Sequence, residues 1–142
     1  MTMEPRISIV TLGVRDVQVS YDFYSKILGF PSVKGIEGDI VFFSLEHLPL
    51  AICPRDKLAE DACVPDEGSG FSGVTRAHNV ESRHEVDRIV QNLREAGVRI
   101  TKKPQPTFWG GYDAYLQDPD GNSWELTWIP TSWLESHTIS EL

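Results

Sequence analysis

The predicted order of helices and strands occurs twice along the chain, and this repetition constrains the fold more than any other feature of the sequence. Residues 6–14 are rich in β-branched side chains that alternate, which predicts a strand. An amphipathic helical pattern follows, with Asp16 as its N-cap and Gly29 as its C-terminal stop. Three strand-sized segments then reach residue 54, and the Gly, Asp and Pro residues between them predict an antiparallel meander.

The second half repeats this order with a stronger helix. Residues 73–80 form a strand candidate, and Ser82 and Glu85 make a capping box before an apolar helical face that ends at Gly97. Three further strand segments follow, and an Asp-Pro-Asp-Gly sequence suited to a tight turn joins the last two. The sequence therefore predicts an α+β fold of two βαβββ modules, although the two halves have low sequence identity.

The length of 142 residues suits a single domain with one substantial core. The segment between the modules mixes charged residues with Pro, Gly and Ser, which indicates an exposed linker. Within one domain at 1–142, the expected divisions are module one at about 5–54, the linker at about 55–72, module two at about 73–130 and a C-terminal tail at 131–142.

The net charge of −8 disfavours nucleic acid and anionic membranes as partners and favours cationic small molecules. No apolar run approaches the roughly 20 residues that a membrane span needs, and the first residues lack a signal-peptide pattern. We therefore expect a cytoplasmic protein. Cys53 and Cys63 lack the spacing of a metal or redox motif, so both are expected to be reduced thiols.

Two stretches carry a resemblance to a known family. The sequence "LGVRDVQVSYDFYSKILGF" (12–30) is similar to the first strand and helix of the vicinal oxygen chelate superfamily, and "DPDGNSWEL" (118–126) is similar to its final hairpin. That superfamily includes glyoxalase I, bleomycin- and fosfomycin-resistance proteins and extradiol dioxygenases. The resemblance implies a mixed sheet that curls into a cup, with helices on the outer face and a ligand inside, and it implies a homodimer.

The resemblance further implies that metal-using members hold a divalent ion with His, Gln or Glu from the first, fourth, fifth and eighth strands. Glu125 matches the eighth-strand position. The other three positions fall on residues that are poor metal ligands: Ile9, Ala51 or Ile52, and Val74 or Thr75. We therefore expect no cofactor, because a Ni, Zn, Fe or Mn site would require His47 or His78 to reach the metal through another strand pairing.

Glu125 is a carboxylate within an otherwise apolar strand. Alternation turns the Trp and Leu side chains of this strand toward the helices and leaves Ser123, Glu125 and Thr127 on the other face. In the family fold that face lines the cup, so Glu125 and Thr127 are candidate ligand contacts and Glu125 is the candidate catalytic base. The alternative is an internal salt bridge, for example to Arg76.

Aromatic and basic residues supply the remaining candidates for ligand binding. Phe108 and Trp109 precede a glycine pair in a loop, where they either close over a ligand or plug the end of the cup or the dimer interface. Alternation favours the cup side for Tyr115, whose hydroxyl could orient a ligand. Arg76 and His78 share one face of their strand, and they line the pocket if that face is the cup but serve an interface otherwise.

Three functions fit these features. The first is a metal-independent homodimer of the bleomycin-resistance type that binds a small amphipathic or cationic molecule. The second is a glyoxalase- or dioxygenase-like enzyme, with either a rearranged metal site or Glu125 as general base. The third is a structural or regulatory dimer whose cup is filled by its own side chains. Metal content separates the metal enzyme from the others, and a Glu125→Gln change separates a metal-free enzyme from a binding protein.

Overall fold

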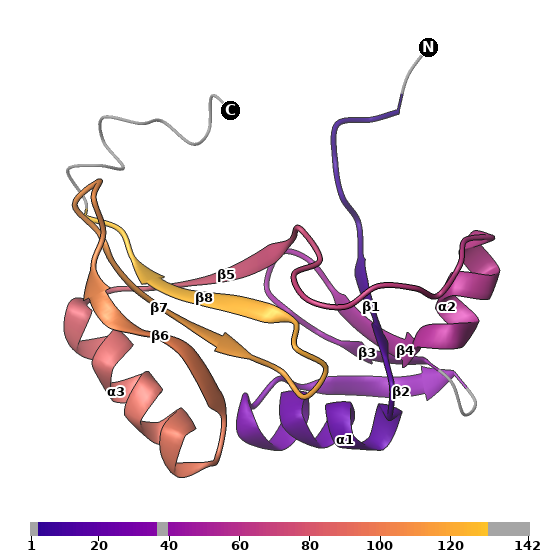
Figure 1. Cartoon of the computed structure of the whole chain (residues 1–142), viewed down its shortest axis with the longest axis horizontal. Coiled ribbons are helices and arrows are strands. Elements are labelled where there is room, and N and C mark those ends of the chain that lie inside the picture. Colours follow the sequence, from indigo (N-terminus) through magenta and orange to yellow (C-terminus); the bar gives the residue numbers. More distant parts are fainter. Residues whose placement is uncertain (1–2, 37–39, 131–142) are drawn as a thin grey trace. The chain divides into compact units, whose positions relative to one another are not determined.

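A computed structural model describes residues 3–36 and 40–130, and it divides the chain into two compact units between Ser69 and Gly70. Each unit contains a four-stranded mixed sheet with a helix in the βαβββ order, which confirms the predicted α+β fold class (Figure 1). Within the described ranges, no helix combines the length and the apolar character needed to cross a membrane.

The first unit has its sheet in the order β1-β4-β3-β2. Strand β1 runs parallel to β4, and the other pairs are antiparallel. The elements are β1 (Val10–Val14), α1 (Val17–Asp22), a π-helical turn η1 (Phe23–Ile27), β2 (Ser32–Ile36), β3 (Ile40–Phe43), β4 (Leu50–Pro54) and α2 (Arg55–Ala62).

Strand β1 is shorter than the predicted strand at 6–14. Only Val10–Val14 pair with β4, whose own five residues limit the length of the ladder. Leu12 and Val14 are buried, whereas Ile7 and Ile9 before the strand are exposed. The alternating apolar pattern therefore continues to the N-terminal side of the residues that form the buried strand.

The first helical segment begins as the sequence predicts, because the Asp16 carboxylate accepts a hydrogen bond of 3.1 Å from the backbone N–H of Val19. It widens into η1, where the N–H of Leu28 donates to the carbonyl of Phe23. Gly29 follows with a φ of 76°, a left-handed conformation that favours glycine. The helix therefore ends where the sequence predicts it to end.

Part of the segment predicted as an exposed linker is helical. Helix α2 occupies Arg55–Ala62, and it ends at Cys63, which has a φ of 58°. None of its residues is fully buried, although Leu58 and Ala59 are half-buried. The helix lacks a side-chain N-cap and a broad apolar face, so neither of the usual sequence signals marks it.

The second unit has its sheet in the order β5-β8-β7-β6, with β5 parallel to β8 and the other pairs antiparallel. The repeated βαβββ order thus produces the same pairing pattern in both units. The elements are β5 (Thr75–Val80), α3 (Arg83–Glu95), β6 (Arg99–Pro106), β7 (Tyr112–Gln117) and β8 (Ser123–Trp128).

Helix α3 packs on one face of this second sheet (Figure 1). Ser82 caps it by accepting a 3.1 Å hydrogen bond from the backbone N–H of Glu85. The shared core contains Val86, Val90, Ala114 and Leu126. Because side chains alternate along a strand, the neighbours of Ala114 and Leu126 in sequence point to the face away from α3. That face carries the candidate site.

Candidate functional site

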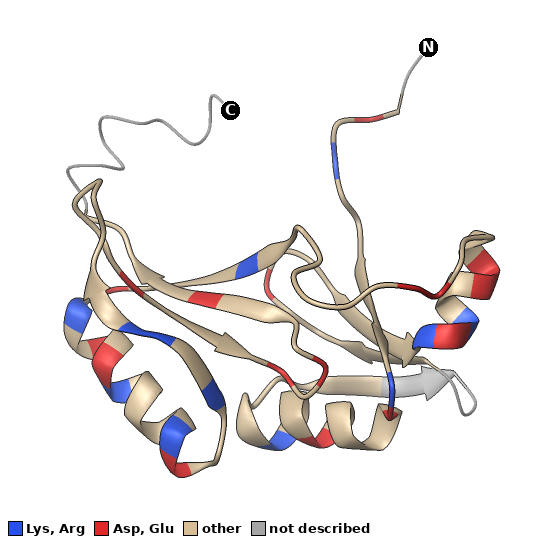
Figure 2. Cartoon of the chain, viewed as in Figure 1, with Lys and Arg blue, Asp and Glu red and all other residues tan. Residues whose placement is uncertain are grey.

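Strands β6 and β7 contribute an ion pair to the face of the second sheet that points away from α3. Lys102 Nζ lies 2.7 Å from Asp113 Oδ1, and Lys102 pairs with Tyr115 in the strand register. The side chain of Asp113 is only 6% exposed. A buried carboxylate of this kind needs a partner, and the Lys102 ammonium supplies it. Figure 2 shows acidic and basic residues on the strands of this sheet as well as on the helices.

Glu125 is a second carboxyl group beside this ion pair. It lies directly across the β7–β8 ladder from Tyr115, so it is diagonal to Asp113, and its side chain makes hydrogen bonds with both residues. Burial and the neighbouring Asp113 raise the pKa of Glu125 to about 7, against opposing effects of Tyr115 and Lys102. Near neutral pH the Glu125 carboxyl group therefore exists in both its protonated and its ionised form.

Tyr115 lies between these charges. Burial and the nearby carboxyl groups of Glu125 and Asp113 raise its pKa above the usual value, so its hydroxyl stays protonated at neutral pH. The Lys102 ammonium lies 5.6 Å from the centre of the Tyr115 ring. The phenol can therefore donate a hydrogen bond to Glu125 and fix the position of that carboxyl group.

Thr127 adds a hydroxyl group to the same face. It pairs with Asp113 in the β7–β8 ladder and is 3% exposed. Among the described residues, its Oγ1 atom finds no hydrogen-bond partner despite its burial. Buried hydroxyls are normally satisfied, so this atom is a polar group available to a ligand. The structure thus brings together three predicted site residues, Tyr115, Glu125 and Thr127.

Arg76 and His78 lie on the opposite face of the sheet from Glu125. They pair with Trp124 and Leu126 in the parallel β5–β8 ladder, and Leu126 belongs to the core under α3. Arg76 Nη1 donates a 3.1 Å hydrogen bond to the carbonyl of Ser123. The cation next to Glu125 is therefore Lys102 rather than Arg76. A ligand-binding role of Arg76 or His78 stays a prediction, because both residues lie on the side of the sheet that faces α3.

Phe108 and Trp109 lie in the turn between β6 and β7, close in sequence to Asp113. Phe108 is fully exposed. Trp109 folds back over Gly111, since a Cβ atom built on Gly111 would lie 2.2 Å from the Trp109 ring. The turn is closed by a 2.8 Å hydrogen bond from the N–H of Gly111 to the Thr107 hydroxyl. Only Phe108 of the two aromatic residues is thus fully available on the surface.

The residues around Glu125 do not fit a metal centre of the family type. Across residues 3–36 and 40–130, no three His, Cys, Asp or Glu side chains converge in a way that could hold an ion. Asp113 is already paired with Lys102, whose charge repels a cation, and Ala77 stands across from Glu125 on β5. The carboxylates of Glu125 and Asp113 alone would suit a hard cation, but the Lys102 ammonium already pairs with Asp113.

Lys102 and Asp113 were not among the predicted site residues. Alternation places Asp113 on the same face as Tyr115, and this pattern could have identified Asp113 as a site residue. Lys102 had no such signal, because the β6–β7 register shifts between Ile100 and Lys102 and again between Lys102 and Gln105. A bulge changes which face a side chain takes, so the pairing had to be seen before Lys102 could be assigned.

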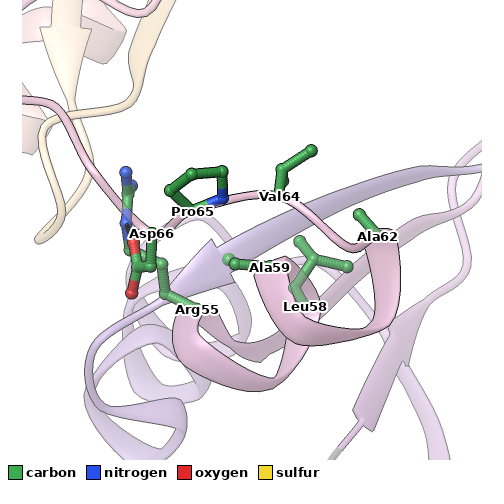
Figure 3. Close-up of a pocket in the computed structure, with 8 residues that line it drawn as sticks. Arg55, Leu58, Ala59, Ala62, Val64, Pro65 and Asp66 are labelled. Carbon is green, nitrogen blue, oxygen red and sulfur yellow. Dashed lines mark hydrogen bonds and ion pairs between the residues drawn. The ribbon is translucent and has the colours of Figure 1, made fainter.

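A separate cavity lies in the first unit beside α2 and has a volume of about 300 Å³. Aliphatic side chains line most of it, and Figure 3 shows Val64 and Pro65 lying over Leu58 and Ala59 of the helix. Arg55 and Asp66 form an ion pair of 2.5 Å at its edge. The cavity offers no catalytic group, because its only charged residues already neutralise each other.

Comparisons with known proteins agree with this fold. A family model described as the Glyoxalase/Bleomycin resistance protein/Dioxygenase superfamily matches residues 6–126. A glyoxalase-related enzyme from Fulvimarina pelagi has a solved structure that superposes with a TM-score of 0.80 at 29% identity, and the match covers 89% of this chain and 90% of that one.

Two relatives are similar in sequence. Lactoylglutathione lyase GLX1 of Arabidopsis thaliana is 37% identical over 125 residues, which cover 82% of this chain and 42% of the lyase. A trivalent organoarsenical cleaving enzyme from Bacillus sp. (strain MD1) is 30% identical over 140 residues, which cover 91% of this chain and 76% of that enzyme. The chain thus spans less than half the length of the lyase.

Proposed function

Because this chain belongs to the glyoxalase/bleomycin resistance protein/dioxygenase superfamily, we propose that it binds a small amphipathic or cationic molecule at the face that carries Glu125, without a family-type metal. Members of this superfamily bind small-molecule substrates. The observation that carries the proposal is the group formed by Glu125, Asp113 and the unpartnered hydroxyl of Thr127. Lys102 already neutralises Asp113, so Glu125 is the carboxylate left for a cation.

Binding of simple aromatic probes tests this proposal. Calorimetry would measure the binding of benzylammonium, benzyltrimethylammonium and neutral benzyl alcohol to three proteins. These are the wild-type chain, Glu125→Gln and the control Glu81→Gln, because the Glu81 side chain is exposed just before α3. Wild type and the control should bind at least one cation, and Glu125→Gln should lose about tenfold or more in affinity, which corresponds to one lost charged contact. No cation binding, or equal binding by Glu125→Gln, would refute the proposal.

The metal-free part of the proposal has its own test. Elemental analysis and native mass spectrometry of the purified chain should find no stoichiometric transition metal. Ni, Zn, Fe or Mn that survives dialysis and is lost in Glu125→Ala would instead support a rearranged metal site. Any small organic molecule that remains bound in the native spectrum would identify the class of ligand directly.

We also expect a cytoplasmic homodimer, since members of this superfamily often form dimers. Light scattering at micromolar concentration should give twice the mass of the 16.0 kDa chain. A monomeric mass at that concentration would contradict this expectation, and it would leave the binding proposal to be judged on the probes alone.

A second candidate function is enzymatic, with Glu125 as a general base. The observation in its favour is that burial and Asp113 raise the pKa of Glu125 to about 7, where a carboxyl group can both accept and return a proton at neutral pH. Turnover would be sought in a substrate panel that includes lactoylglutathione. The enzyme reading requires kcat/KM to rise with pH through about 7 and Glu125→Gln to lose turnover while binding remains.

A further inference from the structure

We propose that Glu125, Thr127 and Asp113 form a subsite for one protonated primary amine, and that the ammonium group takes the place of the proton that Glu125 shares with Asp113. This inference rests on the proposed binding function and specifies its ligand chemistry. Lys102 acts as the positioning residue, since its ammonium lies 2.7 Å from Asp113 Oδ1 and forms an ion pair with it. The exchange therefore takes place at Glu125.

The strand register brings the three groups together. Asp113 stands opposite Thr127, and Tyr115 stands opposite Glu125, on two adjacent antiparallel strands. Side chains at directly opposed and diagonal positions of such strands lie within roughly 4.5–8 Å at their Cβ atoms. Glu125 and Thr127 are two residues apart on β8, so their side chains point to the same face. One small cationic group can therefore contact the Glu125 carboxylate and the Thr127 hydroxyl at the same time.

The charge balance of the site favours a single positive charge. With Glu125 protonated, the charges of Lys102 and Asp113 cancel. With Glu125 ionised, the three groups carry one net negative charge, which one ammonium group neutralises. A divalent ion would leave an excess positive charge next to Lys102 in a partly buried position, which is unfavourable.

The hydrogen-bonding groups favour a primary amine over a quaternary one. An ammonium group has three N–H donors. Glu125 offers carboxylate acceptors, and Thr127 Oγ1 is buried without a partner among the described residues. Lys102 contacts Asp113 through its Oδ1 atom. A quaternary ammonium has no N–H donor, so it would leave Thr127 unsatisfied after desolvation.

The proton balance follows from the state of Glu125 before binding. Burial and Asp113 raise the pKa of Glu125 to about 7, so below that pH the free site holds a proton that the bound amine displaces into solution. The charged and titratable groups that face Glu125 are Asp113 and Tyr115 from β7 and Lys102 from β6, while β5 presents Ala77. No covalent bond forms or breaks other than the O–H bond of Glu125.

Calorimetry with benzylammonium measures this exchange directly. At about pH 6, titrations in two buffers of different ionisation enthalpy should show release of close to one proton per ligand, falling toward zero at about pH 8.5. The affinity should tighten on the order of tenfold per pH unit below about pH 7 and then level off. Benzyltrimethylammonium should bind more weakly than benzylammonium, on the order of fivefold or more, because it cannot donate hydrogen bonds.

Two variants separate positioning from structure. Thr127→Val keeps the shape of the side chain and should weaken benzylammonium several-fold while leaving the quaternary probe unchanged. The control is Thr11→Val, at an exposed position in the first unit. Lys102→Met removes the charge that lowers the pKa of Glu125, so the midpoint of proton release should move to higher pH. A purely structural role of Lys102 would change affinity without moving this midpoint.

The outcomes distinguish this inference from the proposed function. Cation binding that depends on Glu125 but releases no proton at about pH 6 would overturn the inference and leave the proposed function intact. Equal affinity for the primary and quaternary probes, or an unchanged affinity in Thr127→Val, would also overturn it. If no cationic probe binds, both the amine subsite and the proposed binding function would be refuted.

Discussion

Glu125 makes the stability of the chain depend on pH, because its carboxyl group holds a proton more tightly in the folded chain than in the unfolded one. Burial and Asp113 raise its pKa to about 7, so the free energy of unfolding should fall as pH rises from about 4.5 through 7. After allowance for screening by solvent, the cost above that pH is roughly 1–2 kcal/mol. Glu125→Gln cannot ionise, so relative to wild type it should be more stable at about pH 8 than at about pH 5.

Urea unfolding at these two pH values would measure the difference. Glu81→Gln is the matched control, since the Glu81 side chain is exposed. A stability difference between Glu125→Gln and wild type that is the same at both pH values would mean that Glu125 ionises normally, and it would also weaken the case for Glu125 as a general base.

The sequence predicted the individual residues of this face better than it predicted their partners. Alternation correctly separated Glu125 and Thr127 from Leu126, which packs under α3. It could not reveal that the nearby cation is Lys102, because that depends on which strands pair and on the irregular register of β6. Alternation within one strand is a local property, whereas a contact between strands is set by the whole sheet.

Gly111 is a residue whose replacement should disturb the turn between β6 and β7. An added Cβ would lie 2.2 Å from the Trp109 ring and 2.9 Å from the backbone carbonyl of Trp128. Gly111→Ala should therefore displace Trp109 and destabilise the chain by about 1–3 kcal/mol. Trp109→Ala removes the ring but not the Trp128 carbonyl. The double variant Gly111→Ala/Trp109→Ala should therefore recover only part of the stability that Gly111→Ala loses. Full recovery would show that the ring is the sole obstacle.

At the scale of elements, the N-cap of α3 is a point where one side chain supports a whole helix. Ser82 accepts a hydrogen bond from the backbone N–H of Glu85, and α3 carries the buried Val86 and Val90. Ser82→Ala should lower the free energy of unfolding by about 1 kcal/mol, whereas Ser82→Asp should retain most of it because aspartate also caps. Thermal unfolding would rank the stabilities of wild type, Ser82→Ala and Ser82→Asp. An equal loss of stability in the two variants would contradict the capping role.

The elements that the sequence predicted well are those with local signals. Asp16 and Ser82 both cap helices as expected, and Gly29 and Gly97 both have positive φ. Helix α2 was missed because its eight residues have neither a side-chain cap nor a buried face. The π-helical turn η1 was missed as well, because its hydrogen bond from the Leu28 N–H to the Phe23 carbonyl is a backbone feature that no side-chain pattern marks.

For the whole molecule, the repeated order of elements predicted the composition of both sheets. It also explains why β1 and β5, the first strands of the two modules, each pair with the last strand of their own module, in parallel. A helix between two strands permits parallel pairing, and the hairpins that follow are antiparallel. The sequence did not determine the ligand, because the groups proposed to bind it lie on separate strands.

The net charge of the whole chain should act on the rate of ligand binding rather than on the contact itself. The chain carries −8, which attracts cations over long distances. Raising the ionic strength from about 0.01 to about 0.15 M shortens the screening length from about 30 to about 8 Å. The association rate of benzylammonium should therefore fall, while its dissociation rate changes little because the contact with Glu125 is short-range.

Stopped-flow tryptophan fluorescence at the two ionic strengths would separate these rates, with neutral benzyl alcohol as the control ligand. Glu125→Gln should keep most of the salt dependence of association, because it removes one of many negative charges, and should show a faster dissociation. A salt effect found mainly in the dissociation rate would mean that the site is open to solvent and that its charge pair is screened. The burial of Asp113 and Thr127 argues against that result.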